Sequence, residues 1–131
     1  MALDVGRRRV GVAASDELGM IASPVESVDL KRDGFDRLIA VIRRYDPVAI
    51  IVGLPINMSG TEGSQAADVR RFAARLEEAV DIPLIFWDER LTTFMAERTL
   101  AETGHRARAQ RRRVDAVAAA LILQSYLDSL R

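Results

Sequence analysis

The stretch MALDVGRRRVGVAA, residues 1–14, decides the fold class of this chain. It contains two apolar runs, Met1–Val5 and Arg9–Ala14, separated by a very short turn that begins at Gly6. A turn this short predicts an antiparallel hairpin. A third strand is expected at Ile21–Val28, where Pro24 favours an edge position because proline cannot donate a ladder hydrogen bond.

Beyond this meander, the pattern alternates between amphipathic helices and short apolar strands. Asp33 can cap a first helix, whose apolar residues recur at helical spacing until Pro47 stops it. The continuously apolar run Val48–Val52 is typical of a central strand that is covered on both faces, and Leu84–Trp87 is expected to be another buried strand. The expected elements are a helix with the apolar face Phe35–Tyr45, strand Val48–Val52 ended by Gly53 and Pro55, a helix with the apolar face Val69–Val80, strand Leu84–Trp87, a helix from Thr92 or Thr93 to Thr103 with Gly104 after it, a basic linker His105–Arg113 and a last helix Val114–Leu130.

This order predicts one α/β domain, residues 1–131, with a mixed five-stranded sheet and helices on both faces. Right-handed crossovers place the fourth and fifth strands beside the first strand. The carboxyl ends of strands one, four and five then lie at one edge, which is where open α/β sheets bind ligands.

Composition excludes several classes of site. The 131 residues include no cysteine and a single histidine, His105, which rules out thiolate zinc sites, iron–sulfur clusters and multi-histidine metal sites. Basic and acidic residues balance at 19 each, so anion binding must come from local clusters. The longest uncharged apolar stretch, Ala116–Tyr126, is far below the ~20 residues of a membrane span, and no signal segment opens the chain. We therefore expect a cytoplasmic protein without a membrane partner.

Three acidic residues stand out by their apolar surroundings. Asp4 lies inside the first strand, Glu89 follows the last strand, and Asp115 is the only charged residue between Arg113 and Asp128. An isolated carboxylate in such a place is costly unless a cation or hydrogen-bond donors meet it. Because the predicted sheet brings all three toward one edge, they favour a hard cation with oxygen ligands, Mg²⁺ or Mn²⁺.

A purely structural interpretation of these acids is also open. Asp4 could cap a turn, Glu89 could pair with Arg90, and Asp115 could stabilise the N-terminus of the last helix. Asp88 competes with Glu89 for the metal, but neighbouring strand residues face opposite ways, so only one of them can serve.

Four motifs together resemble the YqgF/RuvX family across essentially the whole chain. They are LDVGxxRxGVAxSD at Leu3–Asp16, VGLPxNMxGTEG at Val52–Gly63, DERLTT at Asp88–Thr93 and VDAxAAxLILQ at Val114–Gln124. The resemblance implies an RNase H-like fold related to the RuvC resolvase. It also implies a nuclease that matures the 5′ end of pre-16S rRNA, with Holliday junction resolution as the alternative. Only three residues precede Asp4, fewer than is usual in that family.

The same resemblance implies roles for individual residues. The acidic residues of the family match Asp4, Glu89 and Asp115, which would be both catalytic and metal-binding, and Glu62 is a reserve ligand. Contacts to structured RNA or branched DNA are expected from loop glycines, which allow close backbone approach, and from basic clusters. These contact residues are Arg7, Asn57, Gly60, Gly63, Arg90, Arg111, Arg112 and Arg113. A two-fold junction as substrate would call for a homodimer.

Two rival functions remain. The Gly6–Gly11 spacing mimics the phosphate loop of actin-like ATPases, but Val12 and Ala13 stand where Lys and Ser or Thr are needed, and the chain supplies only one of the two domains that close around ATP. The other rival is a nucleic-acid-binding module that keeps the fold without the chemistry. The presence of all three acids weighs against it.

Overall fold

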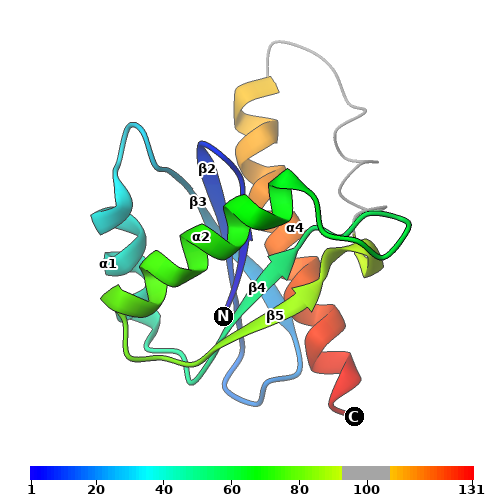
Figure 1. The fold of residues 1–131 in the computed structure, drawn as a ribbon. Coiled ribbons are helices and arrows are strands. Elements are labelled where there is room, and N and C mark those ends of the chain that lie inside the picture. The colour runs from blue at the N-terminus through cyan, green and yellow to red at the C-terminus, as the bar shows by residue number, and fades with distance from the viewer. Residues whose placement is uncertain (93–106) are drawn as a thin grey trace.

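The computed structural model describes residues 1–92 and 107–131. Its centre is a five-stranded sheet in the order β3-β2-β1-β4-β5, in which β1 pairs antiparallel with β2 and parallel with β4 (Figure 1). The strands are β1 Ala2–Val5, β2 Arg9–Ser15, β3 Ala22–Asp29, β4 Ile50–Leu54 and β5 Leu84–Asp88. The helices are α1 Phe35–Tyr45, α2 Ser64–Ala79, the 3₁₀ turn η1 Glu89–Leu91 and α4 Ala107–Ser129. The predicted mixed sheet is confirmed, with the strand bearing Pro24 at one edge.

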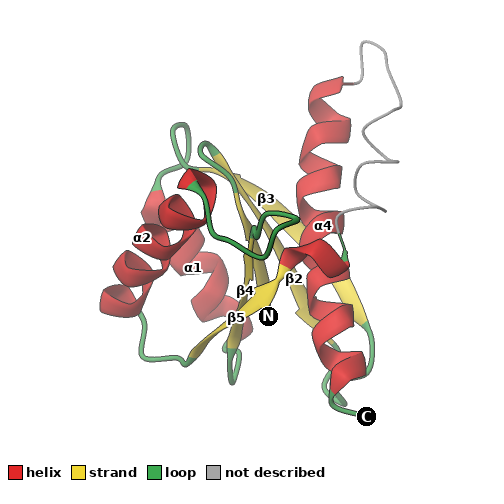
Figure 2. Cartoon of the chain, turned by 45° about the vertical axis from the view of Figure 1, so that its right-hand side comes forward, coloured by secondary structure: helices red, strands yellow, loops and turns green. Residues whose placement is uncertain are grey.

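Helices cover both faces of the sheet, as Figure 2 shows: α1 and α2 lie on one side and α4 on the other. The alternation of side chains along the strands divides the core accordingly. On β1, Leu3 packs with Leu38 of α1 and Leu76 of α2, whereas Ala2 packs with Ala119 and Ile122 of α4. A membrane-spanning helix is absent from the described residues, whose helices are too short or too polar to cross a bilayer.

Three expected boundaries were wrong: both ends of the fourth strand and the start of the first helix. The fourth strand begins at Ile50, because its pairing starts there, with the Ile50 N–H bonded to the carbonyl of Pro83; Val48 is 94% exposed. Gly53 lies inside this strand instead of ending it. The expected cap Asp33 does not cap α1, since its carboxylate accepts bonds from the Arg32 guanidinium and the helix begins after Gly34.

The last helix is longer than expected. The apolar pattern starts at Val114, but α4 already begins at Ala107, so residues 107–113 are helix and not a linker. Arginine and alanine favour helix strongly, so the helix can begin before the apolar pattern does. The helix expected from Thr92 or Thr93 to Thr103 falls outside the described residues, apart from Thr92, whose N–H bonds to the carbonyl of Glu89 at the end of η1.

Candidate active site

Asp4 lies in a row of residues that crosses the sheet beneath α4. Its partner on β2 is Gly11, and the partner of Gly11 on β3 is Ser27. A Cβ atom on Gly11 would stand 1.9 Å from the carbonyl oxygen of Asp115, so only glycine lets the α4 backbone rest at this point. Because Asp4 is directly opposite Gly11, this close contact brings Asp115 of α4 and Asp4 of β1 to the same place.

Glu89 reaches the same place from the other side of β1. It follows β5 in the turn η1, next to Gly53 of β4, where a Cβ atom would lie 3.7 Å from the Glu89 carboxyl carbon. The Asp4 carboxyl donates a hydrogen bond to Glu89. Burial raises the pKa of Asp4 to about 8, and the neighbouring charges of Glu89 and Asp115 add to the shift. Asp4 therefore retains its proton near neutral pH, beside Glu89 at the carboxyl ends of β1 and β5.

Asp115 is held by two side chains from the sheet. Arg9 Nε donates to Asp115 Oδ2 at 2.7 Å, and Ser27 Oγ donates to the same oxygen at 3.0 Å. Asp115 is the ninth residue of α4, so interaction with the helix N-terminus does not account for it, since that effect is confined to the first turn. The alternative in which Asp115 stabilises the N-terminus of the last helix is therefore wrong.

Asp88 and Glu89 have different partners, as expected for neighbouring residues whose side chains face opposite ways. Asp88 pairs with Arg90, whose Nη2 lies 2.6 Å from Asp88 Oδ2, while Glu89 faces Asp4. The Arg90 side chain also donates to the carbonyl of Asn57 at 3.3 Å. Arg90 thus ties the loop after β4 to the turn that carries Glu89, and it is not the partner that the structural interpretation gave to Glu89.

The remaining candidates lie in the loop after β4, in the turn after β1 and in α4. In the loop after β4, Gly60 has a φ of 86°, which favours glycine, and Gly63 precedes α2. Glu62, the reserve ligand, pairs instead with Arg70 of α2 at 2.7 Å. The side chain of Arg7 is 84% exposed, with Nε 3.7 Å from Asp68. Arg111, Arg112 and Arg113 lie in the first turns of α4, and their side chains are outside the described part of the chain.

The donor set fits a hard divalent cation in part. Asp4 and Glu89 offer oxygen ligands and are already in contact, and a cation would compensate the charge that burial makes costly on Asp4. Asp115 contributes its charge nearby, but Arg9 and Ser27 occupy one of its oxygens. Among the described residues, no group of three His, Cys, Asp or Glu is arranged to hold a metal ion as it stands.

A sequence model of one family, described as "RuvX: Holliday junction resolvase", matches residues 1–129. This chain belongs to the RuvX family. Its RuvX relatives include a protein of Thermoanaerobacter pseudethanolicus, 48% identical over 98% of this chain and 95% of its own length, and one of Roseiflexus, 45% identical over 100% of this chain and 94% of its own. Both of these relatives have the name "Putative pre-16S rRNA nuclease".

Solved structures support the RNase H-like arrangement of this RuvX chain. The Fowlpox virus resolvase, solved with Holliday junction DNA, superimposes with a TM-score of 0.53 at 13% identity, covering 98% of this chain and 95% of that one. The Thermus thermophilus RuvC, solved with a Holliday junction, gives a TM-score of 0.50 at 17% identity, with 98% and 92% covered. At these identities the likeness shows the fold alone.

Sequence reasoning missed two residues of the RuvX site, Arg9 and Ser27. The sequence pattern places Arg9 at the start of the second strand and predicts no partner for it, yet Arg9 stands two residues before Gly11 and therefore shares its face of β2. Its partner Asp115 lies 106 residues away, and only the packing of α4 on the sheet joins them.

We expect the Arg9–Asp115 pair to be measurable as a coupling energy. Replacing Arg9 by glutamine leaves the half-buried Asp115 carboxylate without its cation and should cost about 1–2 kcal/mol of unfolding free energy. In the background of Asp115→Asn, the same change should cost much less. A double-mutant cycle by urea denaturation measures this difference. Equal costs in both backgrounds would show that the pair adds nothing to stability.

Proposed function

We propose that this chain is a metal-dependent nuclease that hydrolyses phosphodiester bonds in nucleic acid, acting in the maturation of the 5′ end of pre-16S rRNA. It would act as one domain, in the cytoplasm where ribosomes are assembled. The observation that carries the proposal is the half-buried carboxyl pair Asp4–Glu89, where β1 and β5 end, with Asp115 beside it. The names of the relatives supply the substrate class.

In this proposal Asp4 and Glu89 hold Mg²⁺ or Mn²⁺, and Asp115 completes the site. A divalent cation bound there supplies Lewis-acid activation of a water molecule and stabilises the departing 3′-oxygen. Arg9 and Ser27 fix the carboxylate of Asp115 on the side of Asp4, so that the acids are arranged before substrate arrives.

The proposed substrate contacts come from four segments: the turn η1, the loop after β4, the turn after β1 and the start of α4. Arg90 lies beside Glu89 and braces the loop Asn57–Gly63, whose glycines leave the backbone open to a phosphate. Further phosphate contacts are assigned to Arg7 in the turn after β1 and to Arg111, Arg112 and Arg113 of α4. Aromatic side chains are scarce at 5% of the chain, so reading of base sequence is not expected to dominate.

A Holliday junction is the second candidate substrate, because the family description and the two structural neighbours name it. The test offers the purified protein a pre-16S rRNA fragment with its 5′ extension and, separately, a four-way DNA junction, both with Mg²⁺. Faster cleavage of the rRNA extension, abolished in Asp4→Asn, supports the proposal. Paired incisions in the junction by a protein dimer, with intact rRNA, would replace it by the resolvase function.

Metal binding should strengthen as the pH rises. Without metal, the Asp4 carboxyl keeps its proton up to a pKa of about 8, so a cation must displace that proton to bind. Mg²⁺ affinity should therefore increase up to about tenfold per pH unit below pH 8 and level off above it. Calorimetry in buffers of different ionisation enthalpy counts the released proton. An affinity that does not change between pH 6 and 8, with no proton release, would remove Asp4 from the metal site.

A further inference from the structure

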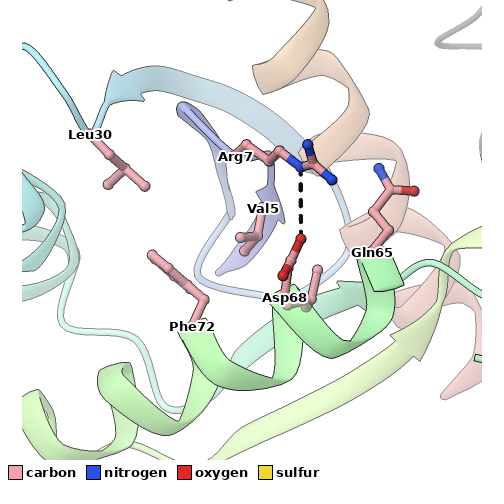
Figure 3. Close-up of a pocket in the computed structure, with 8 residues that line it drawn as sticks. Val5, Arg7, Leu30, Gln65, Asp68 and Phe72 are labelled. Carbon is pink, nitrogen blue, oxygen red and sulfur yellow. Dashed lines mark ion pairs between the residues drawn. The ribbon is translucent and has the colours of Figure 1, made fainter. Parts of the chain in front are cut away.

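A cavity lies on the face of the sheet opposite to α4, between the end of β1 and the first turns of α2. Its volume is about 290 Å³, near the lower end for small-molecule sites. Figure 3 shows Arg7 reaching across it toward Asp68, with Leu30 and Phe72 on one side of this ion pair and Gln65 on the other. The lining residues are Val5, Gly6, Arg7, Leu30, Gln65, Asp68, Val69 and Phe72.

This pocket is close to the acids without being part of their site. Val5 follows Asp4 directly on β1, and successive strand residues face opposite sides of the sheet. Arg7 stands in the turn that follows. A nucleic-acid strand that crosses the sheet edge at the end of β1 can therefore place a phosphate on the Asp4 side and an adjoining group in the pocket.

The lining excludes two simple kinds of occupant. A bare phosphate would meet the carboxylate of Asp68, and a cation would meet the guanidinium of Arg7, whose Nε is 3.7 Å from that carboxylate. Arg71, which lies outside the pocket on α2, also pairs with Asp68 and adds a second positive charge beside this carboxylate. The charges at the mouth therefore favour a neutral ligand that offers both donors and acceptors.

The interior favours a flat, partly apolar ligand. Val5, Leu30 and Val69 provide aliphatic surface, and the Phe72 ring is fixed by an edge-to-face contact with Phe35 at 5.7 Å between centroids. Gln65 adds an amide, which can both donate and accept. An aromatic ring for stacking, aliphatic side chains and a few polar groups are the combination that binds an unstacked base.

We propose that this pocket receives one unpaired nucleobase of the substrate strand. The inference rests on the proposed nuclease function for the identity of the ligand, and it assigns to the pocket the task of holding single-stranded nucleic acid beside the acids. Arg7 then contacts the sugar–phosphate backbone as the strand leaves the pocket.

Amide chemical shifts of the full chain test this in EDTA, where the metal site plays no part. Adenosine 5′-monophosphate and uridine 5′-monophosphate should shift the amides of Val5, Gln65 and Val69, whereas ribose 5-phosphate, which lacks a base, should not. Phe72→Leu removes the ring and Gln65→Leu removes the amide at similar volume. Each should weaken nucleotide binding about tenfold. Ala74→Leu, an exposed position of α2 that does not line the pocket, is the matched control and should bind as the parent does.

The outcomes separate this inference from the proposed function. Equal shifts with ribose 5-phosphate, or no shifts with either nucleotide, would overturn the nucleobase pocket even if the protein cleaves RNA. In cleavage assays, Gln65→Leu should raise KM with kcat unchanged; an unchanged KM would also count against the pocket. Loss of cleavage in Asp4→Asn tests only the proposed function.

Discussion

Replacing Asp4 by asparagine is expected to reduce nucleic-acid cleavage by on the order of 10³-fold, because it removes a charged ligand from the centre where negative charge develops. The same change should stabilise the metal-free protein. The raised pKa of Asp4, about 8, means that the unfolded chain releases this proton more readily than the folded one. The stabilisation should therefore be absent near pH 4, grow as the pH rises, and reach its full size above pH 8.

Asparagine is a suitable replacement because its amide can still donate a hydrogen bond to Glu89, as the protonated Asp4 does. Melting temperatures between pH 4 and 9, recorded in EDTA, measure the stability effect. Asp81→Asn, at an exposed acid before β5, is the control and should alter neither cleavage nor this pH profile. A variant of Asp4 that cleaves at the parental rate would exclude this residue from catalysis.

Replacing Gly11 by alanine should have the largest effect on stability. The new methyl group would lie 1.9 Å from the carbonyl oxygen of Asp115 and 2.3 Å from its carbon, so the α4 backbone would have to move away from β2. We expect a loss of about 3 kcal/mol or more, equivalent to a fall of roughly 10 °C in melting temperature. Cleavage should fall as well, because the shift carries Asp115 away from Asp4.

Gly53→Ala is the informative comparison for this prediction. Its methyl group would approach Ile122 Cδ1 at 2.6 Å, which is the far end of a flexible side chain that can rotate. The loss of stability should therefore be clearly smaller than for Gly11→Ala, as thermal denaturation of both variants measures. Equal losses, or a Gly11→Ala protein as stable as the parent, would contradict the close packing of α4 on β2.

Much of the fold followed from sequence pattern, because the pattern reports burial. The short turn after Gly6 predicted the antiparallel hairpin, Pro24 predicted an edge strand, and the crossover rule placed β4 and β5 beside β1. The same reasoning brought Asp4 and Glu89 together at one edge, as found. Boundaries were less reliable where pairing partners, and not hydrophobicity, set them, as at the start of β4.

What the pattern could not provide were contacts between distant elements. The bonds from Arg9 and Ser27 to Asp115 depend on where α4 crosses the sheet, and this crossing depends on the missing side chain of Gly11. The early start of α4 at Ala107 was also missed, since the sequence of residues 107–113 has no apolar residue other than alanine and so no helical hydrophobic pattern. This early start is important, because it places Asp115 too far from the helix N-terminus for that terminus to stabilise its charge.

The most direct test of the proposed metal centre is the anomalous difference map of a crystal soaked in Mn²⁺ near pH 8, where Asp4 can lose its proton. Our account predicts one strong peak between the carboxylates of Asp4 and Glu89, at about 2 Å from an oxygen of each, with Asp115 on the same side. A peak confined to other acids, or no peak in protein that cleaves nucleic acid under the same conditions, would contradict it.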